Sequence, residues 1–288
     1  MILPLWLALV ALFPASPPRP KLVVVITVDQ LRPDYLDRWK GQFTGGLFQL
    51  VSEGAVFADA YQDHAVTETA PGHSTVLAGR WPAHTGIVSN GLGVEDTAAP
   101  LLGTPGGRPG ASPRRFRGTA FFDWLRAAEP GARALSVSLK DRGAILPLGT
   151  ARADVYWLAA GTGRFTTSRY YADSLPPWVR AFNARTRPPG AWQLLLPDSA
   201  YQENDDEPWE NGGRNRTFPH PFPVTCAPAP TLACGAAPAL DSLTLELAWA
   251  GVEALRLGRR GGTDLLAVSL SVTDLVGHAF GPDSREIH

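Results

Sequence analysis

Two aspartates follow apolar runs that are typical of buried strands. Asp29 ends the run VVVITVD, and Asp274 follows AVSLSVT with His278 four positions later. In open parallel sheets ligands lie at the carboxyl ends of the strands, so both carboxylates are expected at one edge. If a helical turn follows the second strand, Asp274 and His278 face the same way. Such a set suits a divalent metal such as zinc, and the alternative is that each aspartate only caps a helix.

A hydroxyl group is predicted at the start of a short helix in the segment AVTETAPGHSTVLAG, residues 65–79. Pro71 suits the first turn of a helix, and Gly79 favours its end. Thr69 therefore lies where free backbone N–H groups and the helix dipole favour an anion such as phosphate. The threonine is either a helix cap or, if a metal lowers the pKa of its hydroxyl, a nucleophile.

Strand-like and helix-like segments alternate along the chain. Continuous apolar segments predict strands at 21–29, 55–57, 132–140 and 265–272. The first reads as buried on both faces, as in covered parallel sheets. Amphipathic segments predict helices between them, the last capped by Asp241 or Ser242 and ending near Gly258. The alternation predicts an α/β fold with a mostly parallel sheet, interrupted by a Pro-rich and polar insertion or cap at about 150–240.

The N-terminus and the composition bear on location and partners. An apolar run at 2–13, followed by small residues and prolines, predicts a signal peptide over residues 1–18 and a periplasmic or secreted protein. The run is shorter than the roughly 20 residues of a membrane span, and a buried N-terminal helix is the alternative. In an exported protein Cys226 and Cys234 either form a loop disulfide or remain free thiols. The net charge of −1 argues against a nucleic-acid partner.

Six segments occur in the order seen in the PafA-like alkaline phosphatases, which belong to the alkaline phosphatase superfamily. They are VDQLRPDYL, TETAPGHST, GIVSN, SLKDRGAI, TGRFTTSRYY and TDLVGHAFGP. The chain resembles this family from about residue 21 to its last residue. The resemblance implies an exported bacterial phosphomonoesterase with an alkaline-phosphatase-like three-layer sandwich, of which residues 19–288 form the N-terminal part of the catalytic domain.

The resemblance also implies roles for the residues singled out above. Thr69, which directly precedes Ala-Pro-Gly-His, resembles the family nucleophile that forms a phosphothreonine intermediate. Thr69 and Asp29 resemble ligands of the zinc that activates the hydroxyl. Asp274 and His278 resemble ligands of a second zinc that stabilises the leaving oxygen.

Three further residues resemble the family's phosphate contacts. Asn90, in GIVSN, resembles the asparagine that binds a phosphoryl oxygen, and Lys140 and Arg142, in SLKDRG, resemble its basic pair. A phosphate monoester is a dianion, so two cations suit it better than a diester, which carries a second alkyl group. The expected substrate is therefore a small-molecule phosphate monoester. His73 and His84 match no ligand of the family and are expected to be structural.

The sequence departs from the family at its C-terminal end. The family completes its zinc sites with an Asp-His pair and a further His downstream of TDLVGH, whereas this sequence has ten residues after His278. Asp29, Asp274 and His278 match three of the six Asp/His ligands, and His288 is not expected to replace another. We therefore expect a chain that lacks its C-terminal part, binds zinc weakly and is inactive alone.

Other functions fit the same residues less well. A phosphodiesterase or nucleotide pyrophosphatase of the same superfamily is the first alternative. A sulfatase is disfavoured, because Thr69 lies outside the Cys/Ser-x-Pro-x-Arg pattern that sulfatases need. A non-catalytic fragment that binds phosphate or a partner is the alternative from a different class.

Overall fold

The computed structural model describes residues 19–104, 109–159, 162–185, 191–221 and 237–288. A five-stranded sheet with the order β1-β5-β2-β3-β4 lies at its centre. The strands are β1 Leu22–Val28, β2 Ala134–Ser138, β3 Asp154–Ala159, β4 Arg164–Thr166 and β5 Asp264–Leu270. The first four strands of that order are parallel, and β4 is antiparallel to β3. The predicted α/β fold with a mostly parallel sheet is confirmed.

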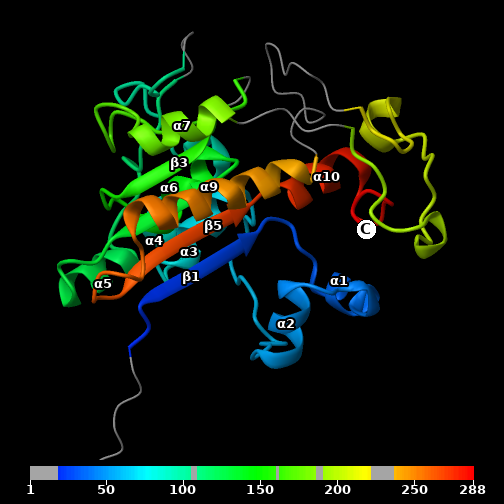
Figure 1. Cartoon of the computed structure of the whole chain (residues 1–288), viewed down its shortest axis with the longest axis horizontal. Coiled ribbons are helices and arrows are strands. Elements are labelled where there is room, and N and C mark those ends of the chain that lie inside the picture. The colour runs from blue at the N-terminus through cyan, green and yellow to red at the C-terminus, as the bar shows by residue number, and fades with distance from the viewer. Residues whose placement is uncertain (1–18, 105–108, 160–161, 186–190, 222–236) are drawn as a thin grey trace, which may run out of the picture.

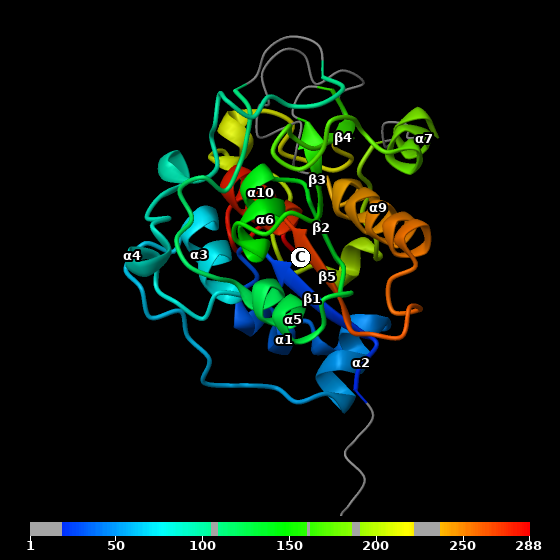
Figure 2. The ribbon, with the colours of Figure 1, turned by 90° about the vertical axis from the view of Figure 1, so that its left-hand side faces the viewer.

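Helices cover the two faces of the sheet, as the two views in Figure 1 and Figure 2 show. The α-helices are α1 Pro33–Arg38, α2 Gly46–Glu53, α3 Thr69–Val76, α4 Pro82–Thr85, α5 Phe121–Ala128, α6 Asp141–Ile145, α7 Pro177–Arg185, α9 Ala239–Leu255 and α10 Val272–Phe280. Short 3-10 turns are η1 Lys40–Gln42, η2 Asn90–Leu92, η3 Leu146–Leu148, η4 Asp198–Ala200 and η5 Glu210–Gly213.

Alternating side chains of the strands feed two separate cores. In β2, Ala134 joins the core under α3, α5 and α6, whereas Leu135 and Val137 join the core under α7 and α9. In β5, Leu265 and Leu266 divide in the same way. The alternation is the period of two that a strand covered on both faces requires. The result is the three-layer arrangement that the sequence predicts.

Strand β1 corrects one expectation. Val23 and Val25 pack against the core under α3 and α5, but Val24 and Ile26 are 49% and 50% exposed. β1 pairs with β5 along one edge, and α9 packs over β2 and β5 instead of reaching β1. The strand is therefore buried on one face, and its continuous apolar run does not indicate cover on both.

Two other boundaries also differ from the sequence prediction. The range 150–240, expected to be an insertion, begins with β3 and β4, which belong to the central sheet. No strand follows the glycine that ends α2 at Gly54, because residues 55–57 run exposed, with Phe57 83% exposed, and pair with no neighbour. The strand positions predicted around β1, β2 and β5 are confirmed.

Some expectations fall on residues outside the described part of the chain. The predicted signal peptide, residues 1–18, and the pair Cys226 and Cys234 lie outside it. Within the described residues, no helix has the length and apolar content needed to cross a membrane.

Candidate active site

Three neighbouring strands deliver charged residues to one edge of the sheet. β1, β5 and β2 are consecutive and parallel, with Val28 opposite Leu270 and Ser138 opposite Ser269. Asp29 directly follows β1, Lys140 follows β2, and Asp274 lies in the first turn of α10, which follows β5. The carboxyl ends of parallel strands meet at one edge, which is why residues separated by more than 200 positions come together.

The lysine ammonium lies between the two carboxylates. Lys140 Nζ is 2.7 Å from Oδ2 of Asp29 and 2.5 Å from Oδ2 of Asp274. The three side chains are 9%, 8% and 16% exposed. At such burial the attraction is screened far less than at the surface, and each charge depends on the others for compensation.

Thr69 borders this charged group. It is the first residue of α3, and its hydroxyl oxygen lies 3.4 Å from Lys140 Nζ. The sequence places Thr69 just before the helix. In the structure Thr69 is the first helical residue, and Glu68 is the N-cap. The hydroxyl is thus at the positive end of the helix, next to an ammonium and two carboxylates.

His73 ties the start of α3 to the end of β5. Nδ1 of the buried ring lies 2.8 Å from the Thr69 carbonyl oxygen, and Nε2 lies 2.8 Å from Ser269 Oγ. Because a carbonyl oxygen only accepts, Nδ1 carries the hydrogen and Nε2 accepts from the serine. Burial lowers the pKa of His73, which favours this neutral form. His84, by contrast, is exposed and stacks on Trp81.

Asn90 is held against the first turn of α3 by two hydrogen bonds. The backbone N–H of Ala70 donates to Asn90 Oδ1 at 2.9 Å. The backbone N–H of Asn90 donates to Glu68 Oε2 at 2.6 Å. With Oδ1 engaged by Ala70, the Nδ2 group is the part of the amide available to an anion.

Arg142 and His278 lie at the margin of the group. Arg142 Nη1 is 3.5 Å from Oδ1 of Asp141, and its buried Nε has no hydrogen-bond partner among the described residues. Its charge acts on His73, whose pKa it helps to lower. His278 Nε2 is 3.4 Å from Oδ1 of Asp274, but its side chain is 58% exposed. Asp274 and His278 do face the same way along α10, as their spacing predicts.

Asp241 fixes the start of the helix that carries Asp274. Its carboxylate accepts hydrogen bonds from the backbone N–H groups of Ser271 at 2.9 Å and Val272 at 3.1 Å. Burial raises the pKa of Asp241 to about 6 despite these bonds, which act the other way. Asp241 was predicted to cap its own helix. It stabilises α10 instead, because α9 begins at Ala239 and its third residue faces the end of β5.

The donors at the centre fit a metal cation in their chemistry. The buried carboxylate of Asp29, the partly buried carboxylate of Asp274 and a hydroxyl surround the Lys140 ammonium, a positive charge of the kind that a divalent ion would supply. In the part of the chain that the structure describes, however, no group of three or more His, Cys, Asp or Glu side chains is arranged to hold a metal ion.

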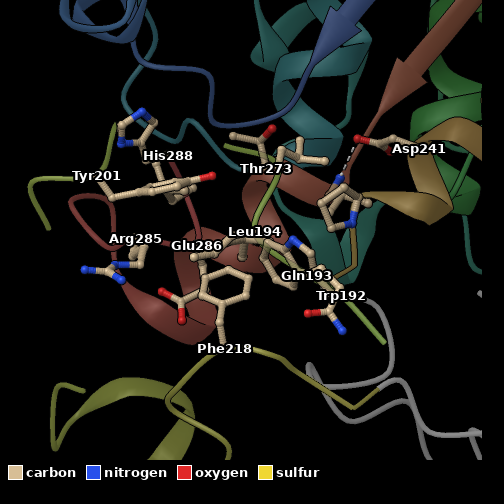
Figure 3. A pocket seen from close by; sticks show the side chains of 15 residues that line it. Trp192, Gln193, Leu194, Tyr201, Phe218, Asp241, Thr273, Arg285, Glu286 and His288 are labelled. Atoms are coloured by element: carbon tan, nitrogen blue, oxygen red, sulfur yellow. Dashed lines mark hydrogen bonds between the residues drawn. The ribbon is translucent and has the colours of Figure 1, made fainter. Parts of the chain in front are cut away.

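A pocket of about 180 Å³ is lined in part by Val272, Thr273 and Val276 of α10 and contains none of the predicted site residues. In Figure 3 the rings of Trp192, Phe218 and Tyr201 line the pocket opposite Thr273 of α10. A dashed line marks the hydrogen bond that the backbone N–H of Val272 donates to Asp241. Its wall combines these rings with charged side chains, among them Arg285 and Glu286.

Two features of the site have no counterpart in the sequence reasoning. Glu68 was not singled out, although an acidic residue directly before a helix is the available signal.

A buried set of Glu210, His220 and Glu286 was also missed. His220 Nε2 lies 2.9 Å from Oε1 of Glu286, and burial followed by Glu286 raises the pKa of Glu210 to about 7. His288, not expected to be a ligand, bonds to Glu203 and Gln42.

The fold and the site together define an α/β protein whose charged centre lies at the carboxyl edge of a mostly parallel sheet. The family model described as type I phosphodiesterase / nucleotide pyrophosphatase matches residues 23–288, and the chain belongs to that family.

Individual relatives narrow the comparison. The chain is 38% identical to alkaline phosphatase PhoV of Synechococcus elongatus, covering 96% of this chain and 54% of that protein. It is 35% identical to alkaline phosphatase PafA of Elizabethkingia meningoseptica, covering 94% and 54%, and 35% identical to alkaline phosphatase PhoK of a Sphingomonas species, covering 93% and 49%. The chain thus spans about half the length of these relatives.

Solved structures agree with the sequence relatives. The crystal structure of wild-type alkaline phosphatase PafA matches with a TM-score of 0.87 and 33% identity, over 94% of this chain and 56% of that one. A PafA mutant altered at one threonine, one asparagine, one lysine and one arginine matches with a TM-score of 0.86 and 31% identity, over 94% and 57%. The alkaline-phosphatase-like fold expected from the sequence is confirmed.

Proposed function

We propose that this chain carries the nucleophile half of a metal-dependent alkaline phosphatase that hydrolyses phosphate monoesters. The observation that carries the proposal is the group at the sheet edge, where the Thr69 hydroxyl lies 3.4 Å from a lysine ammonium held by two carboxylates. A hydroxyl in that position has an adjacent positive charge and a helix N-terminus, both of which favour a phosphoryl anion.

In the proposed reaction the Thr69 hydroxyl gives its proton to solvent, and its oxygen attacks phosphorus and forms a new P–O bond. The bond between phosphorus and the alcohol oxygen breaks, and the alcohol leaves with a proton from solvent. Water then hydrolyses the phosphothreonine, which releases inorganic phosphate and restores the hydroxyl. Zinc, if bound by Asp29 and Thr69 and by Asp274 and His278, lowers the pKa of the hydroxyl and stabilises the leaving oxygen.

Three polar side chains are proposed to hold the phosphoryl oxygens. Asn90 offers its Nδ2 group because Ala70 engages its Oδ1. Arg142 has a buried Nε without a hydrogen-bond partner among the described residues, which suits an incoming anion. Lys140 is the third. The PafA mutant noted above is changed at the same four residue types as Thr69, Asn90, Lys140 and Arg142, in the same order and with the same Thr–Asn and Lys–Arg spacings, which supports the assignment.

The family description supports a second candidate, a phosphodiesterase or nucleotide pyrophosphatase. The two candidates differ in how they use Lys140 and Arg142, since a diester has one negative charge fewer and one substituent more. The sequence relatives named alkaline phosphatases favour the monoesterase. A third possibility, a fragment that binds phosphate without turnover, follows from the half-length match.

The test is hydrolysis of an aryl phosphate monoester, a diester and a sulfate by a completed chain, which also carries the family's C-terminal Asp-His pair and further His, with and without zinc. The proposal predicts zinc-dependent release of the aryl alcohol from the monoester ahead of the other two. Faster diester hydrolysis would favour the phosphodiesterase, and binding of phosphate without any turnover would favour the fragment.

We further propose a periplasmic or secreted location, for which export of a fusion of residues 1–18 to a reporter is the test.

A further inference from the structure

The buried positive charge at the site is unusual in its residue type. The chain has 3 lysines against 23 arginines, and two of the lysines, Lys21 and Lys40, are exposed. The third, Lys140, is partly buried, with a side chain that is 9% exposed, and its ammonium bridges two carboxylates. An ammonium is a compact point charge on a flexible four-carbon stem, whereas a guanidinium is a planar and rigid fork. A lysine at this position can therefore bond both aspartates and can also rotate away.

The contacts of Lys140 place it where a metal cation would have to bind. Its Nζ lies within 2.7 Å of Asp29 and 2.5 Å of Asp274, and Thr69 is at 3.4 Å. The same three residues supply oxygen donors to the two candidate zinc ions, Asp29 and Thr69 to one and Asp274 to the other. A divalent ion bonded to these carboxylates would lie close to the ammonium in a poorly screened site, and the like charges would repel strongly. Both cations cannot hold the same carboxylate oxygens.

We propose that Lys140 is an exchangeable internal counter-ion: its ammonium holds Asp29 and Asp274 together until a divalent cation displaces it and releases it to bind a phosphoryl oxygen. This inference rests on the proposed function, because the cation and the anion are the ones proposed there. The lysine thus has two positions, one on the carboxylates and one on the anion. A cation that drives it from the first to the second tightens anion binding, and by linkage the anion tightens cation binding equally.

Lysine reactivity measures the exchange directly. The purified chain is acetylated briefly at a substoichiometric level, with zinc or with EDTA, and each lysine is quantified by mass spectrometry. Lys21 and Lys40 serve as internal controls, because both are exposed and neither is a predicted site residue. We expect zinc to raise the acetylation rate of Lys140 by about fivefold or more while the two controls stay constant. Zinc binding, measured by calorimetry, without a change at Lys140 would overturn the proposal.

Zinc affinity of variants gives a second measurement. Lys140→Met removes the competing charge and should bind zinc about tenfold more tightly than the wild-type chain. Lys140→Arg keeps the charge and should gain no affinity, and Lys40→Met is the matched surface control. Equal zinc affinity for wild type and Lys140→Met would contradict the exchange. If Lys140→Met does not fold, the acetylation measurement on the wild-type chain still decides.

The outcomes separate this inference from the proposed function. Exposure of Lys140 by zinc, without phosphatase turnover by a completed chain, would leave the exchange standing and reject the catalytic role. Turnover with Lys140 unchanged by zinc would do the reverse. Absence of zinc binding by both the wild type and Lys140→Met would reject the exchange and the metal part of the proposed function together.

Discussion

The backbone N–H of Ala70 donates a hydrogen bond to Asn90 Oδ1 at 2.9 Å, which fixes the orientation of the asparagine amide at the start of α3. Asn90→Asp keeps the acceptor but replaces the free Nδ2 donor by an anionic oxygen. We predict that it weakens inorganic phosphate binding by about tenfold or more, because a hydrogen bond to a charged group is lost.

The matched variant is Asn90→Ala, which loses both the donor and the acceptor. It should also lower the free energy of unfolding by about 1 kcal/mol, whereas Asn90→Asp should leave that free energy nearly unchanged. Calorimetric titration with phosphate and urea unfolding measure the two effects. Wild-type phosphate affinity in Asn90→Asp would reject the role assigned to the amide.

Removing the lysine charge should destabilise the chain when no divalent cation is added. Lys140→Met leaves the carboxylates of Asp29 and Asp274, which are 8% and 16% exposed, without compensation, and breaking an ion pair at such burial costs up to about 3 kcal/mol. Urea unfolding in EDTA measures the loss. The double variant with Asp274→Asn should recover part of it, since one unpaired charge is removed, and failure to recover any would argue against a pairing with Asp274.

Arg142 provides the test of substrate charge. We predict that, in a completed chain, Arg142→Ala slows monoester hydrolysis by about 10- to 100-fold, the effect of one charge-assisted contact, and diester hydrolysis much less. The ratio of kcat/KM for an aryl monoester to that for the matching diester is the measurement. Arg126→Ala, on the exposed side of α5, is a control that should not alter the ratio. Equal losses on both esters would indicate that Arg142 does not read the extra charge.

The stability of the chain should depend on the protonation of Glu210. Burial and then Glu286 raise the pKa of Glu210 to about 7, from an ordinary value of 4.5. Below pH 4.5 the group is protonated in both states. Between these values the unfolded chain releases the proton and the folded chain keeps it, so stability falls as pH rises and the contribution is lost above pH 7.

The expected loss is about 2–3 kcal/mol for this side chain, which is 2% exposed. Glu210→Gln should therefore flatten the decline of the unfolding free energy between pH 5 and pH 8. Glu246→Gln, exposed on α9, is the matched control and should leave the slope as it is. An unchanged slope in Glu210→Gln would contradict a raised pKa.

Much of the site could be predicted from the sequence because it is built at strand ends. Asp29, Lys140 and Asp274 each follow a recognisable apolar strand, and parallel strands bring such residues to one edge. The direct bonds of Lys140 to both carboxylates could not be predicted in this way. They depend on β1, β5 and β2 being neighbours, and strand order is not encoded in the local pattern.

The remaining differences arise from contacts made at long range. The apolar run of β1 resembles that of β5, yet only β5 is covered on both faces, because the position of α9 over the sheet decides burial. The position of α9 also explains why Asp241 caps α10 and not its own helix. Glu210, His220 and Glu286 come from distant segments, and nothing in their spacing indicates that they meet.

Trapping the covalent intermediate tests the central claim most directly. A completed chain, which also carries the family's C-terminal Asp-His pair and further His, is mixed with zinc and a phosphate monoester labelled at phosphorus, quenched in acid and digested. The account predicts label on the peptide that contains Thr69 and none in Thr69→Ala, with Thr67→Ala as a neighbouring control that stays labelled. Label on another residue, or full turnover by Thr69→Ala, would contradict the assignment of Thr69 as the nucleophile.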